Sequence, residues 1–79
     1  MLLRQDIDII KFLQQVKRCR DEVLFETTEG DRLYLTSTLS QYVFCSIASH
    51  PEYWTDSTIT CKNTEDYQLL TDYLYERNA

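Results

Sequence analysis

The chain has 79 residues, of which 43% are hydrophobic and 27% are charged, with one glycine and one proline. This length allows one domain with one small core, and the composition is too apolar for a disordered chain. Thirteen acidic and eight basic side chains give a net charge of −5, which argues against a nucleic-acid binder because such a protein needs a cationic surface.

The first half of the chain predicts a helix followed by a β-hairpin. Residues 6–19 carry apolar side chains at helical spacing, and Asp6 or Asp8 can cap the start of that helix. Residues 21–37 then alternate with period two, and Gly30 lies where a tight turn needs a residue that tolerates positive φ. The alternation predicts an inward set and an outward pair on the hairpin: Val23, Phe25, Leu33 and Leu35 inward, and Arg32 and Tyr34 outward.

The second half predicts a helix, a loop, a strand and a final helix. Residues 36–48 form the second predicted helix, and Pro51 ends it because proline lacks an amide donor. Residues 57–62 alternate as a third strand, and Asn63 caps a last helix that runs to near the end of the chain. The apolar faces of these elements are predicted to be Leu39, Tyr42, Val43 and Ile47 on the second helix, Ile59 and Cys61 on the strand, and Tyr67, Leu70 and Leu74 on the last helix.

Each predicted strand has one apolar face and one polar face, so the helices are expected to cover one side of an antiparallel sheet. The predicted fold class is therefore α+β, an open-faced sandwich of three to four strands with three helices on one face. We expect a single domain over residues 1–79.

The stretches "KFLQQVKRCRDEVLFETTEGDRLYLTSTLSQY" and "STITCKNTEDYQLLTDYL" give the chain a resemblance to HPr, the histidine-containing phosphocarrier family of the bacterial sugar phosphotransferase system. The resemblance extends from about Ile9 to Tyr75 and implies a β-α-β-β-α-β-α fold. Only "MLLRQ" precedes the first helix, so the family's first strand is expected to be reduced or absent.

In the HPr family the phosphorylated histidine lies just before the first helix. Here Gln5 stands at about that position, and Asp6 and Asp8 follow it. Glutamine cannot form the phosphoramidate, and the two carboxylates would repel an incoming phosphate. We therefore expect a degenerate family member without the active-site histidine, which is not an enzyme, with no catalytic, cofactor-binding or metal-binding residues.

Some HPr proteins also carry a regulatory serine at the start of the second helix, and the resemblance puts Ser37 at that position. Thr36 stands where the family has a basic neighbour. Phosphorylation of Ser37 by a kinase is one hypothesis. The other is that Ser37, Thr36 or Thr38 only caps the helix, since a hydroxyl oxygen there can accept from amides that otherwise lack partners.

A missing first strand would leave the strand over residues 57–62 as an open edge, to which another chain could add a strand. Thr58 and Thr60 are the candidate partner-binding residues under that hypothesis. The alternative is that Met1 to Gln5 cover this edge.

The loop "HPEYWTDS" carries Tyr53 and Trp54, which either contact a partner or form a lid over the end of the core. Tyr34, facing out of the hairpin, is a further candidate for partner contact. Because a small domain needs its large apolar groups, the lid is the preferred interpretation of the loop.

The three cysteines, Cys19, Cys45 and Cys61, are widely spaced and form no C-x-x-C motif, so neither a disulfide framework nor a zinc site is indicated. A thiol or metal enzyme would need the fold to bring Cys45, Cys61 and His50 together. This is the third hypothesis, and a solvated loop histidine is the simpler interpretation of His50.

No apolar run approaches the roughly 20 residues of a membrane-spanning helix, and the acids in "MLLRQDIDII" interrupt the segment that a signal peptide would need. We expect a cytoplasmic protein that binds neither nucleic acid nor membrane. The sequence favours a non-catalytic, HPr-like regulatory module that acts by binding a protein partner or by self-association. The alternative is a phosphotransfer-system component phosphorylated on Ser37.

Overall fold

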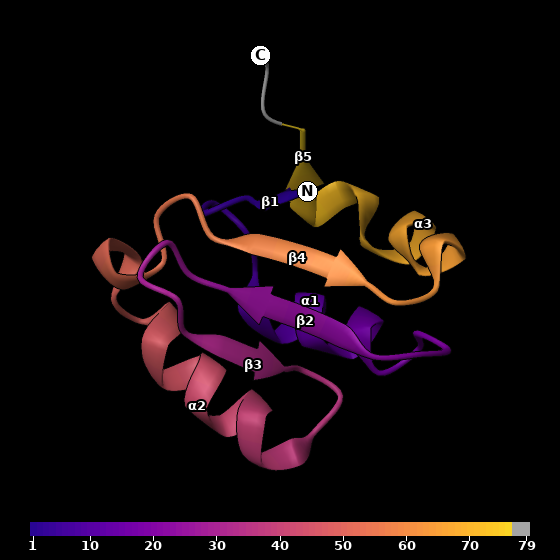
Figure 1. Cartoon of the computed structure of the whole chain (residues 1–79), viewed down its shortest axis with the longest axis horizontal. Helices are drawn as coiled ribbons and strands as arrows, with labels where there is room; N and C mark the ends of the chain where they lie inside the picture. Colours follow the sequence, from indigo (N-terminus) through magenta and orange to yellow (C-terminus); the bar gives the residue numbers. More distant parts are fainter. Residues whose placement is uncertain (77–79) are drawn as a thin grey trace.

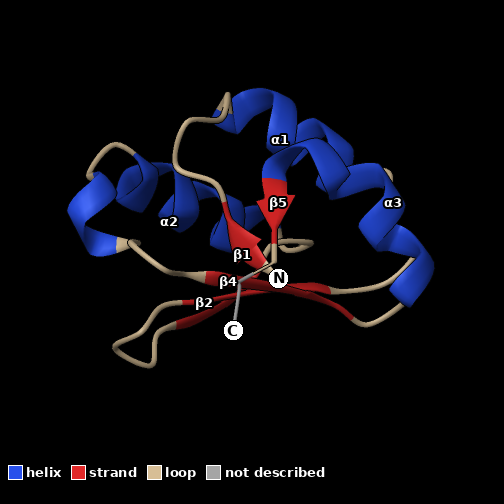
Figure 2. Ribbon diagram, turned by 90° about the horizontal axis from the view of Figure 1, so that it is seen from above, coloured by secondary structure: helices blue, strands red, loops and turns tan. Residues whose placement is uncertain are grey.

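An antiparallel sheet with α-helices packed on one of its faces forms the part of the chain that the computed structural model describes, residues 1–76 (Figures 1 and 2). The strands of the described residues are β1 (Leu2–Leu3), β2 (Val23–Glu26), β3 (Arg32–Tyr34), β4 (Thr58–Cys61) and β5 (Leu74–Tyr75). The α-helices are α1 (Ile9–Val16), α2 (Thr38–Ala48) and α3 (Tyr67–Leu70). The predicted α+β class and open-faced sandwich are confirmed, but the sheet of this part of the chain has five strands where three to four were predicted, because Leu2–Leu3 and Leu74–Tyr75 both pair as short strands.

The helix and hairpin of the first half form where the sequence predicts them. The Asp8 side chain accepts a hydrogen bond from the Lys11 amide at 3.2 Å and so caps α1. Gly30 adopts a φ of 97° in the turn between β2 and β3, a conformation that residues with a Cβ adopt at a cost. The hairpin register places Phe25 opposite Leu33.

The strand order is β3-β2-β4-β1-β5, so β4 lies inside the sheet. The hypothesis of an open edge at β4 is therefore wrong. Although β1 has only two residues, the Leu3 amide donates to the Ser57 carbonyl at 3.0 Å and the Ile59 amide donates to the Met1 carbonyl at 2.8 Å. Further along, the Cys61 amide donates to the Tyr67 hydroxyl at 3.0 Å. Strand addition beside Thr58 and Thr60 is blocked, because these backbone groups already have partners.

The last predicted helix is shorter than expected. Two 3₁₀ turns, Thr64–Asp66 and Thr71–Tyr73, flank α3, and the chain then pairs with β1 as β5. Leu74 satisfies the helical spacing of that segment and also the strand pairing, in which it lies opposite Leu3. Backbone pairing with β1 therefore decides the conformation here, and the part of the predicted helix beyond residue 76 lies outside the described residues.

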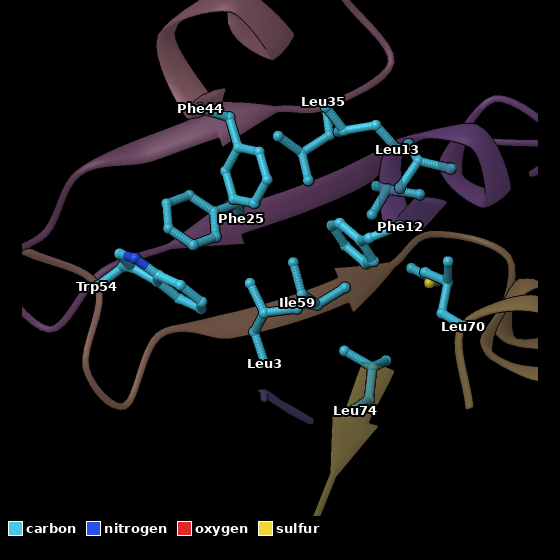
Figure 3. Close-up of a cluster of buried hydrophobic side chains, with 13 residues drawn as sticks. Leu3, Phe12, Leu13, Phe25, Leu35, Phe44, Trp54, Ile59, Leu70 and Leu74 are labelled. Carbon is cyan, nitrogen blue, oxygen red and sulfur yellow. The ribbon is translucent and has the colours of Figure 1, made fainter. Parts of the chain in front are cut away.

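The core lies between the sheet and the helices (Figure 3). The predicted inward residues Val23, Phe25, Leu35 and Ile59 are fully buried, and Leu33 is partly buried against them. The Phe44 ring of α2 contacts both layers: its centroid lies 5.9 Å from that of Phe12 on the neighbouring helix α1 and 4.9 Å from that of Phe25 on the sheet.

The predicted apolar face of α2 is wrong for Leu39, Tyr42 and Val43, whereas Ile47 is partly buried against the core as predicted. Phe44 alone is buried among the residues of α2, all of which the structure describes. Leu39 and Tyr42 are 75% and 78% exposed, and Val43 is 41% exposed. Apolar residues surround this helix, so their spacing does not select one face. The contacts of the Phe44 ring with Phe12 and Phe25 select it instead.

Candidate functional site

The outward face of α2 presents large apolar side chains to solvent. Leu39 and Tyr42 protrude from it, and Val43 lies at its flank. On α1, Ile10 is 68% exposed and lies three residues before Leu13, so both occupy neighbouring positions on one side of that helix. A shallow hollow of about 370 Å³ separates the two helices; it is lined by Leu13, Thr38, Gln41, Tyr42, Cys45 and Ser46. We call this surface of α1 and α2 the α2 face.

Three of the polar side chains around the α2 face, those of Gln41, Ser46 and Ser49, are bonded within the chain. The Ser46 hydroxyl donates to the Tyr42 carbonyl at 3.3 Å, and the Ser49 hydroxyl donates to the Ser46 carbonyl at 2.9 Å. The Gln41 side-chain amide donates to the Leu35 carbonyl at 2.7 Å. A partner that covers this face would therefore leave these donors satisfied, and the cost of burying them would be small.

The α2 face was not among the predicted sites, although the sequence contains a signal for it. Residues 33–49 include no Asp, Glu, Lys, Arg or His in a chain that is 27% charged. A solvated helix usually shows charges opposite its buried stripe. The absence of charge from every side of this helix is the pattern that could have indicated an interaction surface.

Ser37 begins α2 with extended backbone angles, and its carbonyl accepts from the Gln41 amide at 3.0 Å. Its side chain makes no capping hydrogen bond with the residues that the structure describes. Ser37, Thr36 and Thr38 are all exposed. Ser37 therefore occupies the cap position through its backbone, and its hydroxyl remains accessible.

A hollow that Thr36 lines, just before this helix start, mixes charges of both signs. It holds about 330 Å³ and is lined by Thr36 together with Cys19, Arg20, Asp21, Glu22 and Lys62. Arg20 also lies 3.9 Å from the Glu65 carboxylate. This arrangement offers no concentrated positive charge for a phosphate group.

Gln5, at the position that the resemblance gives to histidine, joins two loops. Its side-chain amide donates to the Pro51 carbonyl at 2.9 Å and lies 3.3 Å from the Thr55 hydroxyl. Beside it, the hydrogen bond and positive charge of Arg4 lower the pKa of Asp6, which keeps that carboxylate ionised. The local chemistry is that of a structural cross-link next to a negative charge.

The structure brings three of the predicted partner-binding residues onto one face of the sheet, opposite the helices. Tyr34 and Thr60 both lie opposite Leu24, one from each neighbouring strand, and Thr58 lies opposite Glu26. Tyr34 is 46% exposed. The Glu26 carboxylate also pairs with Arg32 at 3.4 Å, so this surface mixes apolar, hydroxyl and charged groups.

The two aromatic residues of the loop after α2 differ in burial. Trp54 is 2% exposed and packs inside the core, which excludes it from direct contact with a partner (Figure 3). Its position agrees with the lid interpretation and follows from the large apolar area that a small core needs. The indole Nε1 of Trp54 and the hydroxyl of Ser57 are buried without hydrogen-bond partners among residues 1–76. Tyr53 is 65% exposed, with its ring centroid 5.5 Å from that of His50.

The cysteines lie in different environments. Cys45 is exposed on α2, whereas burial, together with nearby Cys19 and Asp66, raises the pKa of the Cys61 thiol to about 12. Burial, with a contribution from Asp66, likewise raises the pKa of Cys19 to about 11. Both thiols are thus protonated at neutral pH and weakly nucleophilic. The fold does not bring Cys45, Cys61 and His50 together, and across residues 1–76 no three His, Cys, Asp or Glu side chains form a possible metal site.

The buried carboxylate of Asp66 has a structural role. It accepts hydrogen bonds from the Arg20 amide at 3.0 Å and from the Asp21 amide at 3.1 Å. These bonds hold the turn after α1 against the start of α3. The satisfied carboxylate is therefore an anchor within the fold.

The fold and its exposed surfaces define a small α+β sandwich with an uncharged, apolar helix face. The chain matches no protein-family model, no curated protein and no solved structure. In the described part of the chain, no helix is long and apolar enough to span a membrane.

Proposed function

We propose that this chain is a non-catalytic, HPr-like regulatory module that acts by binding protein through the α2 face. The observation that carries the proposal is the exposure of Leu39 and Tyr42, each about three-quarters accessible at neighbouring positions on α2, where Tyr42 also lines an apolar hollow. Scattered apolar residues are normal on a protein surface, but a contiguous patch is typical of an interaction site.

Two features support the HPr-like part of the proposal. Through β4 and α3, the element order is the β-α-β-β-α-β-α order of that family, with β5 added after it. The side chain of Gln5 is used to connect loops, beside an ionised Asp6, which supports a module without the phosphocarrier reaction.

Affinity capture from a lysate of cells that make the chain tests the binding function. The bait is the native chain, beside Tyr42→Asp and the matched control Tyr53→Asp, which changes another exposed tyrosine, outside the α2 face. We expect at least one protein, a second copy included, to be recovered with the native chain and with Tyr53→Asp but not with Tyr42→Asp. Equal recovery with all three baits would contradict binding through this face.

The second candidate function is that of a phosphotransfer-system component phosphorylated on Ser37. The accessible Ser37 hydroxyl, uncommitted at the start of an 11-residue helix, favours it, because a phosphate there would be stabilised by the helix dipole. This function predicts an acid-stable phosphate after incubation with a kinase fraction and ATP. The label would be lost in Ser37→Ala and kept in Thr36→Ala; labelling that persists in Ser37→Ala would contradict it.

A further inference from the structure

The exposed apolar area of the α2 face is more than half of what a standard interface between proteins buries on each partner. Its four large apolar side chains, Ile10, Leu39, Tyr42 and Val43, together expose about 500 Å², taking roughly 150–250 Å² for a fully exposed large side chain. A standard interface buries about 800 Å² on each partner. The neighbouring Thr38, Ser46 and Ser49 extend the face toward that area.

The absence of charged side chains from α2 indicates what kind of partner the α2 face can bind. All thirteen acidic and eight basic side chains lie outside residues 33–49. Two copies of a chain with a net charge of −5 repel each other wherever acidic surfaces meet. The α2 helix is a surface on which two copies can pack with no like charges in contact, whereas a charged partner would find nothing on it to complement.

The shape of the α2 face also favours a second copy of the chain as the partner. The exposed side chain of Leu39 lies one turn before Tyr42, which lines the hollow together with Leu13 and Cys45. A surface that carries both a protrusion and a hollow can be complementary to itself across a two-fold axis, since each copy supplies the protrusion for the hollow of the other. The hydroxyls of Ser46 and Ser49 already donate to their own helix, so burying them in the contact would leave no serine donor without a partner.

We infer that the occupant of the α2 face is a second copy of this chain, packed through α2 as an isologous homodimer. This inference rests on the proposed binding function and names its partner. It places Tyr42 and Cys45 of both copies near the two-fold axis, because both residues lie in the middle turns of α2.

Sedimentation equilibrium of the purified chain over a range of concentrations tests the inference. We expect a monomer–dimer equilibrium that Tyr42→Asp weakens at least about 30-fold, the effect of losing one interface hot spot. The control Tyr53→Asp should leave the equilibrium unchanged. Raising the salt from about 0.05 M to about 0.5 M should strengthen the dimer, because salt screens the repulsion between the two acidic copies.

Chemical cross-linking gives an independent readout in the native chain. Cys45 is exposed, Cys61 is buried and Cys19 is partly buried. A short bis-maleimide should therefore join two copies through Cys45, and Cys45→Ser should abolish the cross-linked dimer. Circular dichroism of each variant confirms that it folds.

A native chain that remains monomeric, or a dimer that Tyr42→Asp leaves intact, would overturn the inference. If the chain is monomeric, capture of a different protein that Tyr42→Asp loses would keep the proposed binding function while excluding the homodimer. A monomer that captures no protein through this face would contradict both the homodimer and the proposed binding function.

Discussion

Helices α1 and α2 lie on the same side of the sheet, but they contribute to the fold in different ways (Figure 2). Of the eight residues of α1, Phe12, Leu13 and Val16 are buried, whereas α2 has eleven residues and buries Phe44. Lys11 lies on the exposed side of α1, while α2 has no charged residue. Phe44, with the partly buried Ile47 beside it, attaches α2 to the core, whereas Leu39 and Tyr42 of the same helix remain exposed.

The largest expected effects concern the two phenylalanines that face each other. Phe12→Ala and Phe44→Ala should each lower the free energy of unfolding by about 3–5 kcal/mol, because both rings are fully buried. Urea titration followed by Trp54 fluorescence measures this, in the Tyr42→Asp background so that self-association does not contribute. A loss under about 1 kcal/mol for Phe44→Ala would break the comparison, since α2 would then be attached by other contacts.

Replacing one leucine on each helix should give clearly different losses of stability. Leu13→Ala should cost about 2–4 kcal/mol because Leu13 is buried, and Leu39→Ala should change stability by no more than about 0.5 kcal/mol. The same urea titration applies. Leu39→Ala should nevertheless weaken association of the native chain, and a similar stability loss for both leucines would show that the α2 face serves the core.

The helix caps give a smaller contrast. Asp8→Ala should cost about 1 kcal/mol, because the Asp8 carboxylate accepts from the Lys11 amide. Ser37→Ala should change stability by only a few tenths of a kcal/mol (about 0.3), since the Ser37 hydroxyl makes no capping bond with the described residues. Asp8→Asn is the matched control because it keeps an acceptor at the cap. A cost of about 1 kcal/mol for Ser37→Ala would assign a capping bond to that hydroxyl in solution.

A pH-dependent contrast is expected between the buried thiols and the exposed thiol of Cys45. Burial raises the pKa of Cys19 to about 11 and of Cys61 to about 12, above the value of about 8.5 for an exposed thiol. The folded chain therefore holds these protons after the unfolded chain has released them. The stabilisation they give is fully present below about pH 8.5 and is lost between there and about pH 12.

The urea midpoint measured between about pH 8 and about pH 10 should therefore fall. The fall should be smaller in Cys61→Ala and unchanged in Cys45→Ala, whose thiol lies exposed on α2. An equal reduction in both variants would contradict the assignment of the effect to the buried thiols.

The local pattern of the sequence was sufficient for the hairpin and for the inward set of the strands. A strand has two faces, and Val23, Phe25, Leu35 and Ile59 made one of them strongly apolar, so alternation left one choice. Gly30 and Asp8 mark a turn and a cap for reasons contained within a few residues. The fold class and the first helix follow from such signals.

The pattern was insufficient wherever a distant segment decided the outcome. Two residues of β1 carry no periodicity, yet backbone pairing with β4 and β5 places them inside the sheet and closes the edge beside Thr58 and Thr60. Leu74 fits a helix or a strand, and its pairing with Leu3 selects the strand.

The same holds for the candidate site. Apolar residues lie all around α2, so spacing alone could not say which of them would be buried. Phe44 is buried because its ring packs against those of Phe12 and Phe25, and these contacts form only when the sheet and α1 come together. Leu39 and Tyr42 remain exposed to solvent. The sequence by itself determined that α2 is an uncharged helix; the tertiary packing decided which of its apolar side chains remained available for binding.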